Sequence, residues 1–462
     1  MRTLILLLLS SSQLTAATWF VDSTASGANN GTSWANAWQT IAAIGSTPAA
    51  GDTVYISGGA TGTNQTYNSG TWAPKGGTLG NVVTYQIGQD SLHNGVAIFN
   101  RTSGTIFINQ SSHFKVSGDA GNNKCHFRTK GWGQLGYEDS QTEVEFDFIE
   151  CDDSAFGDAV EGQNVTMIIV NSCILSNALA SSDHLFNTGF GGHNWDENVM
   201  ESNLLYCPQI TSSPNIGADF WNIGGSGTTW KYNTLIGYNN SSYSTGQHQD
   251  GIQFIGAQDH LKFIGNRFIN IKNFSIFGDA VQGHQTNILV LNNIFQSSAG
   301  AVFGTDGSYF GPLPNIFSDI IIAGNTFDCP DNGGQPLSLN NVTGFSTTFL
   351  RDVVADNVII AGGGTSFTGN TTSTITNNPA MTAVQAATNF VSYISAGNTN
   401  NNLNLHIRSS LITAGTNLST YFNTDYAGNA RPATGAWDIG AYQYQSGIVT
   451  YPQQNGFQIP FN

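Results

Sequence analysis

Charged residues are scarce in this chain: Asp, Glu, Lys and Arg make up 10% of its 462 residues, against about 25% in ordinary domains. Basic residues are the scarcest, with 14 Lys plus Arg against 30 Asp plus Glu and a net charge of −16. Nucleic acid rewards a basic face, so this composition excludes it as a partner. It also disfavours a strongly anionic ligand, unless a metal ion or a cluster of the few cations intervenes.

Long apolar runs are also lacking, apart from Leu4–Leu9 near the start of the chain. That run is much shorter than the ~20 residues that span a bilayer. It follows Arg2 and precedes the small residues Thr15–Ala17. This order predicts a signal peptide over residues 1–17, cut after Ala17. We therefore expect a secreted protein, extracellular or at the cell surface, with no membrane span.

Cysteine is limited to five residues, at positions 125, 151, 173, 207 and 329. An odd number leaves at least one thiol outside any intrachain disulfide. Cys151 and Cys173 are 22 residues apart, which is compatible with stacking in adjacent coils of a repeat. The favoured interpretation is that they are small buried residues.

Glycine, with 54 residues, is abundant, and a short apolar strand followed by Asn and a second apolar pair recurs along the chain. Clear copies are Leu261–Phe268 and Leu289–Phe295. The Asn residues of the copies are Asn171, Asn203, Asn233, Asn266, Asn293, Asn325 and Asn357, spaced 27 to 33 residues apart. No helical pattern lies between the copies, so each unit is predicted to be one coil of short strands. The Asn side chains should stack as a ladder.

The predicted fold is therefore all-β: a single-stranded right-handed parallel β-helix, a solenoid, over residues 18–445. Ser33 before Trp34, Ala37, Trp38 and Ile41 predicts a short N-terminal capping helix. Residues 371–445 lose the Asn period and should close the other end of the solenoid. Residues 446–462 contain no charged residue and are predicted to form a loose tail. We expect a monomer.

Both ends of the chain resemble a known family. Residues 19–22 (WFVD), 30–38 (NGTSWANAW) and 51–56 (GDTVYI) are similar to the opening of secreted bacterial pectate-lyase-like β-helix proteins. Residues 425–432 (DYAGNARP) and 437–442 (WDIGAY) are similar to their closing segment. The resemblance implies the β-helix fold and export, in a group with many lyases, hydrolases and epimerases and some non-enzymes. It implies cap roles for Asp425, Arg431 and Asp438.

A column of acidic residues follows once the Asn period sets the register. Asp158, Asp219, Asp250 and Asp279 stand 13 to 16 residues before the next Asn, whereas Asp183 and Asp306 need insertions. Equivalent residues in adjacent coils would lie ~4.8 Å apart. Carboxylates at that spacing either raise one another's pKa or share a cation such as Ca²⁺. The alternative is a repeated strand-opening turn in which each Asp bonds nearby backbone N–H groups.

The densest part of this column predicts the active site. Asp250 and Asp279 are the expected acid and base, with His248 and His284 beside them to orient or share protons. Asp219, Trp221 and Gln253 would bind the sugar, Trp221 by stacking. The Gly283–His284 pair and the Asp residues are similar to polygalacturonase-type hydrolases, but Gln249 and Gln285 depart from that pattern.

A lyase interpretation uses other residues. Lys262 and Arg267 could neutralise a uronate, with Ca²⁺ bound by Asp219, Asp250 and Asp279. The alternative for these cations is a solvated outer face. Because basic residues are scarce, hydrolysis of an extracellular polysaccharide is favoured over β-elimination. The rival hypothesis is a non-catalytic glycan-binding or cell-surface adhesive β-helix. No cofactor is required except Ca²⁺ in the metal-dependent alternative.

Overall fold

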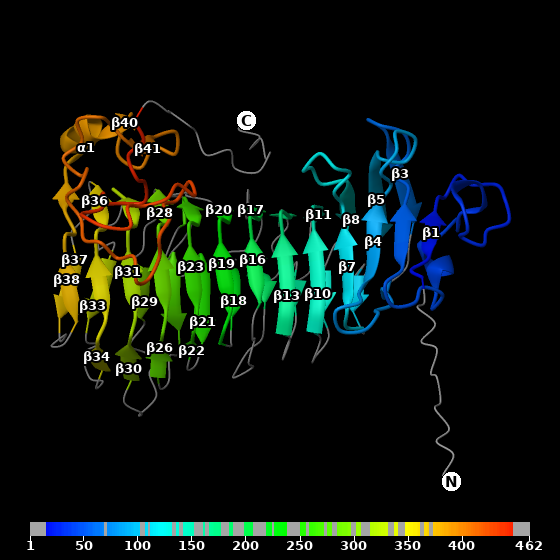
Figure 1. Ribbon diagram of the computed structural model, residues 1–462, viewed down its shortest axis with the longest axis horizontal. Helices are drawn as coiled ribbons and strands as arrows, with labels where there is room; N and C mark the ends of the chain where they lie inside the picture. The colour runs from blue at the N-terminus through cyan, green and yellow to red at the C-terminus, as the bar shows by residue number, and fades with distance from the viewer. Residues whose placement is uncertain are drawn as a thin grey trace, which may run out of the picture.

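The protein is a β-solenoid whose coils follow one another along a single long axis (Figure 1). This computed structural model describes residues 15–68, 72–101, 107–109, 111–131, 135–137, 142–151, 160–161, 166–176, 184–187, 198–206, 219–223, 226–237, 250–255, 258–271, 275–279, 284–296, 302–305, 315–330, 337–340, 347–360, 365–368 and 373–446. Among these residues the strands form four long parallel sheets, which we call sheets A to D. The predicted parallel β-helix is confirmed.

Sheet A contains 13 strands in the described part of the chain. They are β1 (Thr18–Val21), β2 (Thr53–Ile56), β4 (Val83–Ile87), β7 (Phe114–Ser117), β10 (Thr142–Asp147), β13 (Thr166–Asn171), β16 (Val199–Glu201), β19 (Thr229–Lys231), β23 (Lys262–Ile264), β27 (Leu289–Leu291), β31 (Ile321–Ala323), β35 (Val353–Ala355) and β38 (Thr374–Thr376). Side chains alternate between the interior and the outward face, as in β2, where Val54 and Ile56 are buried and Thr53 and Tyr55 are not.

Sheet B follows sheet A in each coil and has 12 strands among the described residues. They are β3 (Asn64–Asn68), β5 (Val96–Arg101), β8 (Phe127–Gly131), β11 (Ile149–Cys151), β14 (Ile174–Ser176), β17 (Leu204–Tyr206), β20 (Thr234–Ile236), β24 (Arg267–Ile269), β28 (Ile294–Gln296), β32 (Thr326–Asp328), β36 (Val358–Ile360) and β39 (Ala380–Met381). Its inward rings stack along the axis, with Phe268 4.9 Å from Phe295 and Phe295 4.6 Å from Phe327 between ring centroids.

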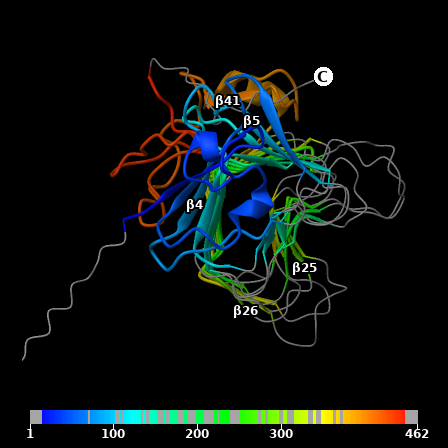
Figure 2. The ribbon, with the colours of Figure 1, turned by 90° about the vertical axis from the view of Figure 1, so that its right-hand side faces the viewer.

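Sheet C comes next and has ten strands within the described ranges. They are β6 (Phe107–Asn109), β9 (Leu135–Tyr137), β12 (Val160–Glu161), β15 (His184–Asn187), β18 (Asp219–Ile223), β21 (Ile252–Ile255), β25 (Ile276–Asp279), β29 (Val302–Thr305), β33 (Leu337–Asn340) and β37 (Thr365–Thr368). In four of the described coils a strand of sheet D leads back towards sheet A: β22 (Gln258–Asp259), β26 (His284–Thr286), β30 (Asn315–Ser318) and β34 (Thr347–Leu350). Figure 2 shows these sheets enclosing the interior when the solenoid is viewed end-on.

The corner between sheets A and B holds the Asn ladder. The side-chain amide of Asn266 donates to Oδ1 of Asn293 at 3.0 Å and to the carbonyl of Trp230 at 3.0 Å. Oδ1 of Asn293 also accepts the backbone N–H of Asn266 at 2.8 Å. The same pattern links successive members of the ladder: Asn203, Asn233, Asn266, Asn293, Asn325, Asn357 and Asn378.

The prediction of the Asn ladder is wrong for one residue. Asn171 is the last residue of β13 and pairs with Asp147 and Glu201 on the outward face of sheet A. Cys173 occupies the ladder position, and its backbone N–H donates to Oδ1 of Asn203 at 2.9 Å. The alternative that Cys151 and Cys173 stack in adjacent coils is wrong. In this register Cys151 pairs with Leu175, two positions beyond Cys173. Cys151 and Cys173 are both fully buried.

The N-terminal end is closed by two 3₁₀ segments, Trp34–Asn36 and Ile41–Ile44, in place of the one helix predicted there. Ser33 caps the first segment, as its spacing predicted. Ala37 and Thr40 are extended, because the backbone around Trp38 bonds to β1 and ends the first segment. Trp38 stacks on Trp19 with ring centroids 5.3 Å apart, so these residues cover the interior at this end.

The C-terminal segment was predicted to close the end of the solenoid. It also folds back over the outward faces of the last coils. The helix α1 (Ala383–Asn389) and the antiparallel pair β40 (Phe390–Ser392) and β41 (Asn402–Leu405) precede a long irregular stretch. The apolar side chains that pack the stretch onto sheet A are Leu418, Phe422 and Trp437, against Leu289, Leu291, Ile321 and Ala323. No helix in the described ranges is long and apolar enough to cross a membrane.

Arg431 fastens this segment. It is 4% exposed and donates to the carbonyls of Asp438 at 3.0 Å and Gly440 at 2.8 Å, and to Oδ1 of Asn292 at 2.9 Å. Burial lowers the pKa of Arg431 to about 10, although nearby carboxylates act in the other direction. Asp425 and Asp438 accept bonds within the same segment. The cap role implied by the family resemblance for these residues agrees with the geometry.

Candidate functional site

The strand register of sheet C corrects the predicted Asp column. Trp221 pairs with Ile252, so Asp219 and Asp250 occupy equivalent positions two residues earlier. Ile252 pairs with Ile276, and Asp279 comes three positions after that pair, opposite Ile255. Asp250 and Asp279 are therefore five positions apart, about 16 Å along the strands. The other proposed members, Asp158, Asp183 and Asp306, lie outside the described residues.

The length of one turn accounts for three of these five positions. Gln258 and Gln285 are paired in sheet D. Gln258 comes three positions after Ile255, whereas Gln285 comes six positions after Asp279, the partner of Ile255. Counting back from the Asn ladder assumes equal turns and shifts Asp279 out of register.

Asp250 lies on the interior side of the sheet. It stands two positions before Ile252, which is fully buried, and Asp250 itself is 0% exposed. A carboxylate closed off from solvent does not meet a polysaccharide on the outward face. Its catalytic role stays a prediction, and its burial counts against that role.

The histidines are not gathered around Asp250 in the described structure. His284 begins β26 and pairs with Ile316 in sheet D, a different sheet from the one that holds β21. His248 lies outside the described residues. The predicted group of His248, Asp250, Asp279 and His284 is therefore not one constellation in the part that can be placed.

The predicted substrate-binding residues separate in the same way. Lys262 is on sheet A, where it pairs with Thr229 and Leu289. Arg267 is on sheet B and donates to Oε1 of Gln296 at 2.8 Å and to the carbonyl of Thr399 at 2.7 Å. Arg267 thus holds the C-terminal segment. Its role toward a uronate stays a prediction, and these bonds count against that role.

A row of polar residues that was not predicted from the sequence shares one register along sheet C. Glu161 pairs with Asn187, and Asn222 pairs with Gln253. Asn187 also pairs with Asn222, so one polar residue stands at the same register on each of four consecutive strands. Strands are ~4.8 Å apart, which makes the row about 14 Å long.

The alternate positions of these strands form the inward column. Phe186 pairs with Trp221, Trp221 with Ile252, and Ile252 with the fully buried Ile276. Trp221 therefore shares a register with Ile252 and Ile276, and its sugar-stacking role stays a prediction. Asp279 comes three positions after Ile276 and two after Phe277, the partner of Gln253. The signal in the sequence is the polar–apolar alternation of each short strand.

A second polar surface lies on the outward face of sheet A. The ammonium of Lys115 is 2.9 Å from a carboxylate oxygen of Glu145 and 2.7 Å from one of Asp147. Burial opposes the charge of Lys115, but these two bonds outweigh it and raise the pKa of Lys115. Burial raises the pKa of Asp147, against the effect of Lys115. Farther along, Glu201 pairs with Lys231 at 2.8 Å. The charged groups of this surface therefore bond to one another.

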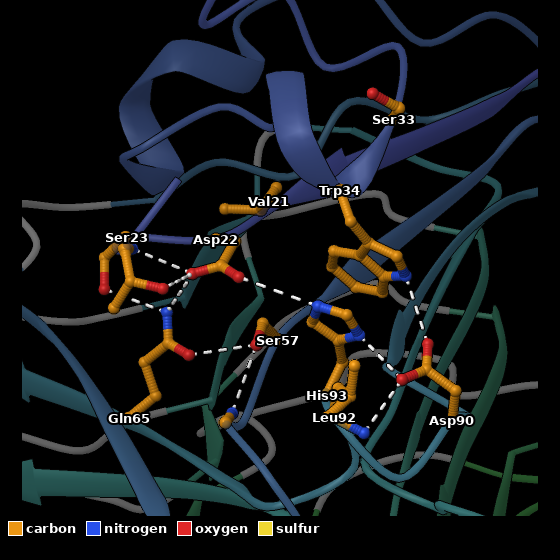
Figure 3. A network of polar contacts seen from close by, with 12 residues as sticks. Val21, Asp22, Ser23, Ser33, Trp34, Ser57, Gln65, Asp90, Leu92 and His93 are labelled. Atoms are coloured by element: carbon orange, nitrogen blue, oxygen red, sulfur yellow. Dashed lines mark hydrogen bonds and ion pairs between the residues drawn. The ribbon is translucent and has the colours of Figure 1, made fainter. Parts of the chain in front are cut away.

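The third polar group is at the N-terminal corner (Figure 3). His93 contacts Asp90 at 2.7 Å through Nδ1 and lies 3.8 Å from Asp22 through Nε2. The indole of Trp34 stacks on His93 with ring centroids 3.7 Å apart and donates to Asp90 at 3.1 Å. Gln65 donates to Asp22 at 2.8 Å. Burial acts to raise the pKa of Asp90, but its bonds to His93 and the Leu92 backbone prevail and lower it. This network ties the cap to the first coils.

Among the described residues, no group of three or more His, Cys, Asp and Glu side chains is placed so that it could hold a metal ion. Asp219 and Asp279 are placed through their backbone register alone. The Ca²⁺ alternative therefore stays a prediction.

No protein-family model matches this chain, and no curated protein matches it. Among solved structures it is similar to the pectate lyase Pel9A, at 15% identity over 93% of this chain and 97% of the other, with a TM-score of 0.39. It is also similar to XylC in complex with xylose (10% identity, 92% and 98%, TM-score 0.40) and to a lacto-N-biosidase from Eubacterium ramulus (9%, 78% and 68%, TM-score 0.40). Likeness at this level concerns the fold, and the chemistry rests on this chain's own residues.

Proposed function

We propose that this protein binds an extracellular polysaccharide along the outward face of sheet C and cleaves it by hydrolysis. The observation that carries the proposal is the row Glu161, Asn187, Asn222 and Gln253, in register on four consecutive strands. Amide and carboxylate groups at regular spacing suit the hydroxyl groups of a repeating sugar chain. The protein would meet this polymer outside the cell, as a monomer.

Hydrolysis is favoured over elimination by what the row contains. Its four positions include one carboxylic acid and no Lys or Arg, whereas elimination from a uronate needs a cation or metal to neutralise the carboxylate. Asp279 supplies an acidic position one strand beyond Gln253. Glu161 lies four strands from it, about 19 Å, so the two carboxyl groups do not act as a pair. In this assignment Asp279 replaces Asp250 as the candidate acid or base.

The test is a cleavage assay over plant, algal and bacterial polysaccharides. New reducing ends without absorbance near ~235 nm indicate hydrolysis, whereas that absorbance reports the unsaturated product of elimination. Asp279→Asn should abolish cleavage with an unchanged melting temperature. Asp250→Asn is the matched control, and as a buried change it should lower the melting temperature. Loss of cleavage with full stability in Asp250→Asn, and none in Asp279→Asn, would restore the original assignment.

The rival function, non-catalytic glycan binding or adhesion, rests on the same row. It predicts that a polysaccharide is retained but not shortened by the wild-type protein. Added chelator tests the Ca²⁺-dependent alternative. Loss of cleavage that Ca²⁺ restores would indicate that the reaction needs the metal.

A further inference from the structure

The outward face of the first three strands of sheet A is uncharged and partly aromatic. The six outward residues of β1, β2 and β4 are Thr18, Phe20, Thr53, Tyr55, Thr84 and Gln86. Phe20 lies 4.8 Å from Trp34 and 6.1 Å from Tyr55 between ring centroids. We call Trp34, Phe20 and Tyr55 the aromatic platform. All three are only half-buried.

One member of the aromatic platform, Trp34, is fixed in place by its neighbours. Trp34 stacks on His93 at an interplanar angle of 6°, and its indole N–H is bonded to Asp90 (Figure 3). His93 is itself fixed by Asp90 and faces Asp22. A ring already fixed in place loses little conformational freedom when a ligand stacks on it, which favours binding.

Polar groups beside the aromatic platform have bonding capacity to spare. Within the described residues, the side chains of Thr53, Tyr55, Thr84 and Gln86 have no hydrogen-bond partner, and all four are partly exposed. Aromatic rings next to free hydroxyl and amide groups are the combination that holds sugar rings, apolar face against ring and hydroxyls against polar groups.

Charge determines which sugars fit. The six outward positions carry no ionisable acid or base apart from the Tyr55 phenol. The first cation beyond them, Lys115, is taken by Glu145 and Asp147. With a net charge of −16 on the chain, an anionic polymer gains nothing here. The far end of the same sheet face is covered by the C-terminal segment, and its middle carries the charged pairs of Lys115 and Lys231. The uncharged part of this face that is left for a ligand is therefore its N-terminal end.

We propose that the aromatic platform and its neighbouring Thr and Gln residues form a second glycan-binding surface, which holds an uncharged polysaccharide at a site separate from sheet C. The surface would anchor the protein on a neutral polymer. It needs no contribution from the row on sheet C and stands whether or not the protein cleaves anything.

The test is affinity electrophoresis of the full chain through gels containing hydroxyethylcellulose, with polygalacturonate as the anionic comparison. Hydroxyethylcellulose should retard the wild-type protein, and polygalacturonate should not. Tyr55→Ala should weaken retardation at least about tenfold in apparent Kd, the effect of losing one stacked contact. Tyr55→Phe should retain most of it, because the ring remains. Tyr421→Ala removes a tyrosine that is 43% exposed on the C-terminal segment and should change nothing.

The outcomes separate the two sites. Retardation lost in Tyr55→Ala, with cleavage and melting temperature intact, supports the proposal. No retardation of the wild-type protein by hydroxyethylcellulose, or equal retardation of Tyr55→Ala, overturns it. Retardation lost in Asn222→Ala/Gln253→Ala but kept in Tyr55→Ala would assign the binding to sheet C and also overturn it. If Tyr55→Ala fails to fold, Tyr55→Leu keeps an apolar side chain without the aromatic face and should show the same loss.

Discussion

Replacing one member of the Asn ladder should cost far more stability than its size suggests. Asn293 is fully buried. Its Oδ1 accepts the backbone N–H of Asn266 at 2.8 Å and the side-chain amide of Asn266 at 3.0 Å. Its own amide donates to the carbonyl of Phe263 at 2.9 Å and to Oδ1 of Asn325 at 3.0 Å. Asn293→Ala removes all four bonds.

The magnitude follows from the groups left without a partner. The backbone N–H of Asn266 is left without a partner. The carbonyl of Phe263 loses one bond but stays paired with β27 in sheet A, and the amide of Asn266 keeps its bond to Trp230. Each buried polar group left unpaired costs about 1–3 kcal/mol. With the lost ladder bonds added, Asn293→Ala should lower the free energy of unfolding by about 3–6 kcal/mol.

The assay is chemical denaturation followed by circular dichroism, with Asn171→Ala as the matched control. Asn171 is half-buried on sheet A, outside the ladder, and the one bond its side chain accepts comes from Ser172 at 3.1 Å. Its loss should cost less than about 1 kcal/mol. Equal losses for the two variants would refute the ladder as the element that aligns the coils.

Two further predictions concern the C-terminal end. Arg431→Met leaves Oδ1 of Asn292 and the carbonyl of Asp438 without their buried donor, so it should release the segment to limited proteolysis and destabilise the protein by about 3–5 kcal/mol. Burial raises the pKa of Asp352 and of Asp356 to about 6. The folded state therefore binds more protons than the unfolded state between about pH 4 and 6, and stability should rise as the pH falls from 7 to 4. Asp356→Asn should flatten this rise, and a melting temperature that falls steadily from pH 7 to 5 would contradict it.

The sequence was sufficient to predict the architecture because a repeat displays its own register. Six of the seven proposed ladder residues, Asn203 to Asn357, bond in the predicted order. The failure at Asn171 is informative. Cys173 fills the ladder site there by presenting its backbone N–H, a substitution that a search for Asn does not detect.

The candidate site was harder to predict because it depends on turns, and not on the repeat. Three of the five positions by which Asp279 leaves the Asp column come from extra residues between sheets C and D, a change that no count from the ladder reveals. The burial of an acidic side chain was equally hard to predict from the sequence. An Asp before a strand looks the same in sequence whether it lies inside, as Asp250 does, or outside. Arg267 looked like a substrate cation because its partner, the carbonyl of Thr399, lies 132 residues away in the chain.

The central claim, that sheet C presents a polysaccharide-binding face, is tested most directly by the affinity of Asn222→Ala/Gln253→Ala for the glycan that the wild-type protein binds or cleaves. Asn68→Ala/Asn100→Ala is the control, since it removes an amide pair at 3.2 Å on neighbouring strands of sheet B. Loss of two hydrogen bonds of about 1 kcal/mol each predicts an affinity about 10- to 100-fold weaker for the sheet C variant alone. Unchanged affinity in the sheet C variant, or the same loss in both, would contradict the claim.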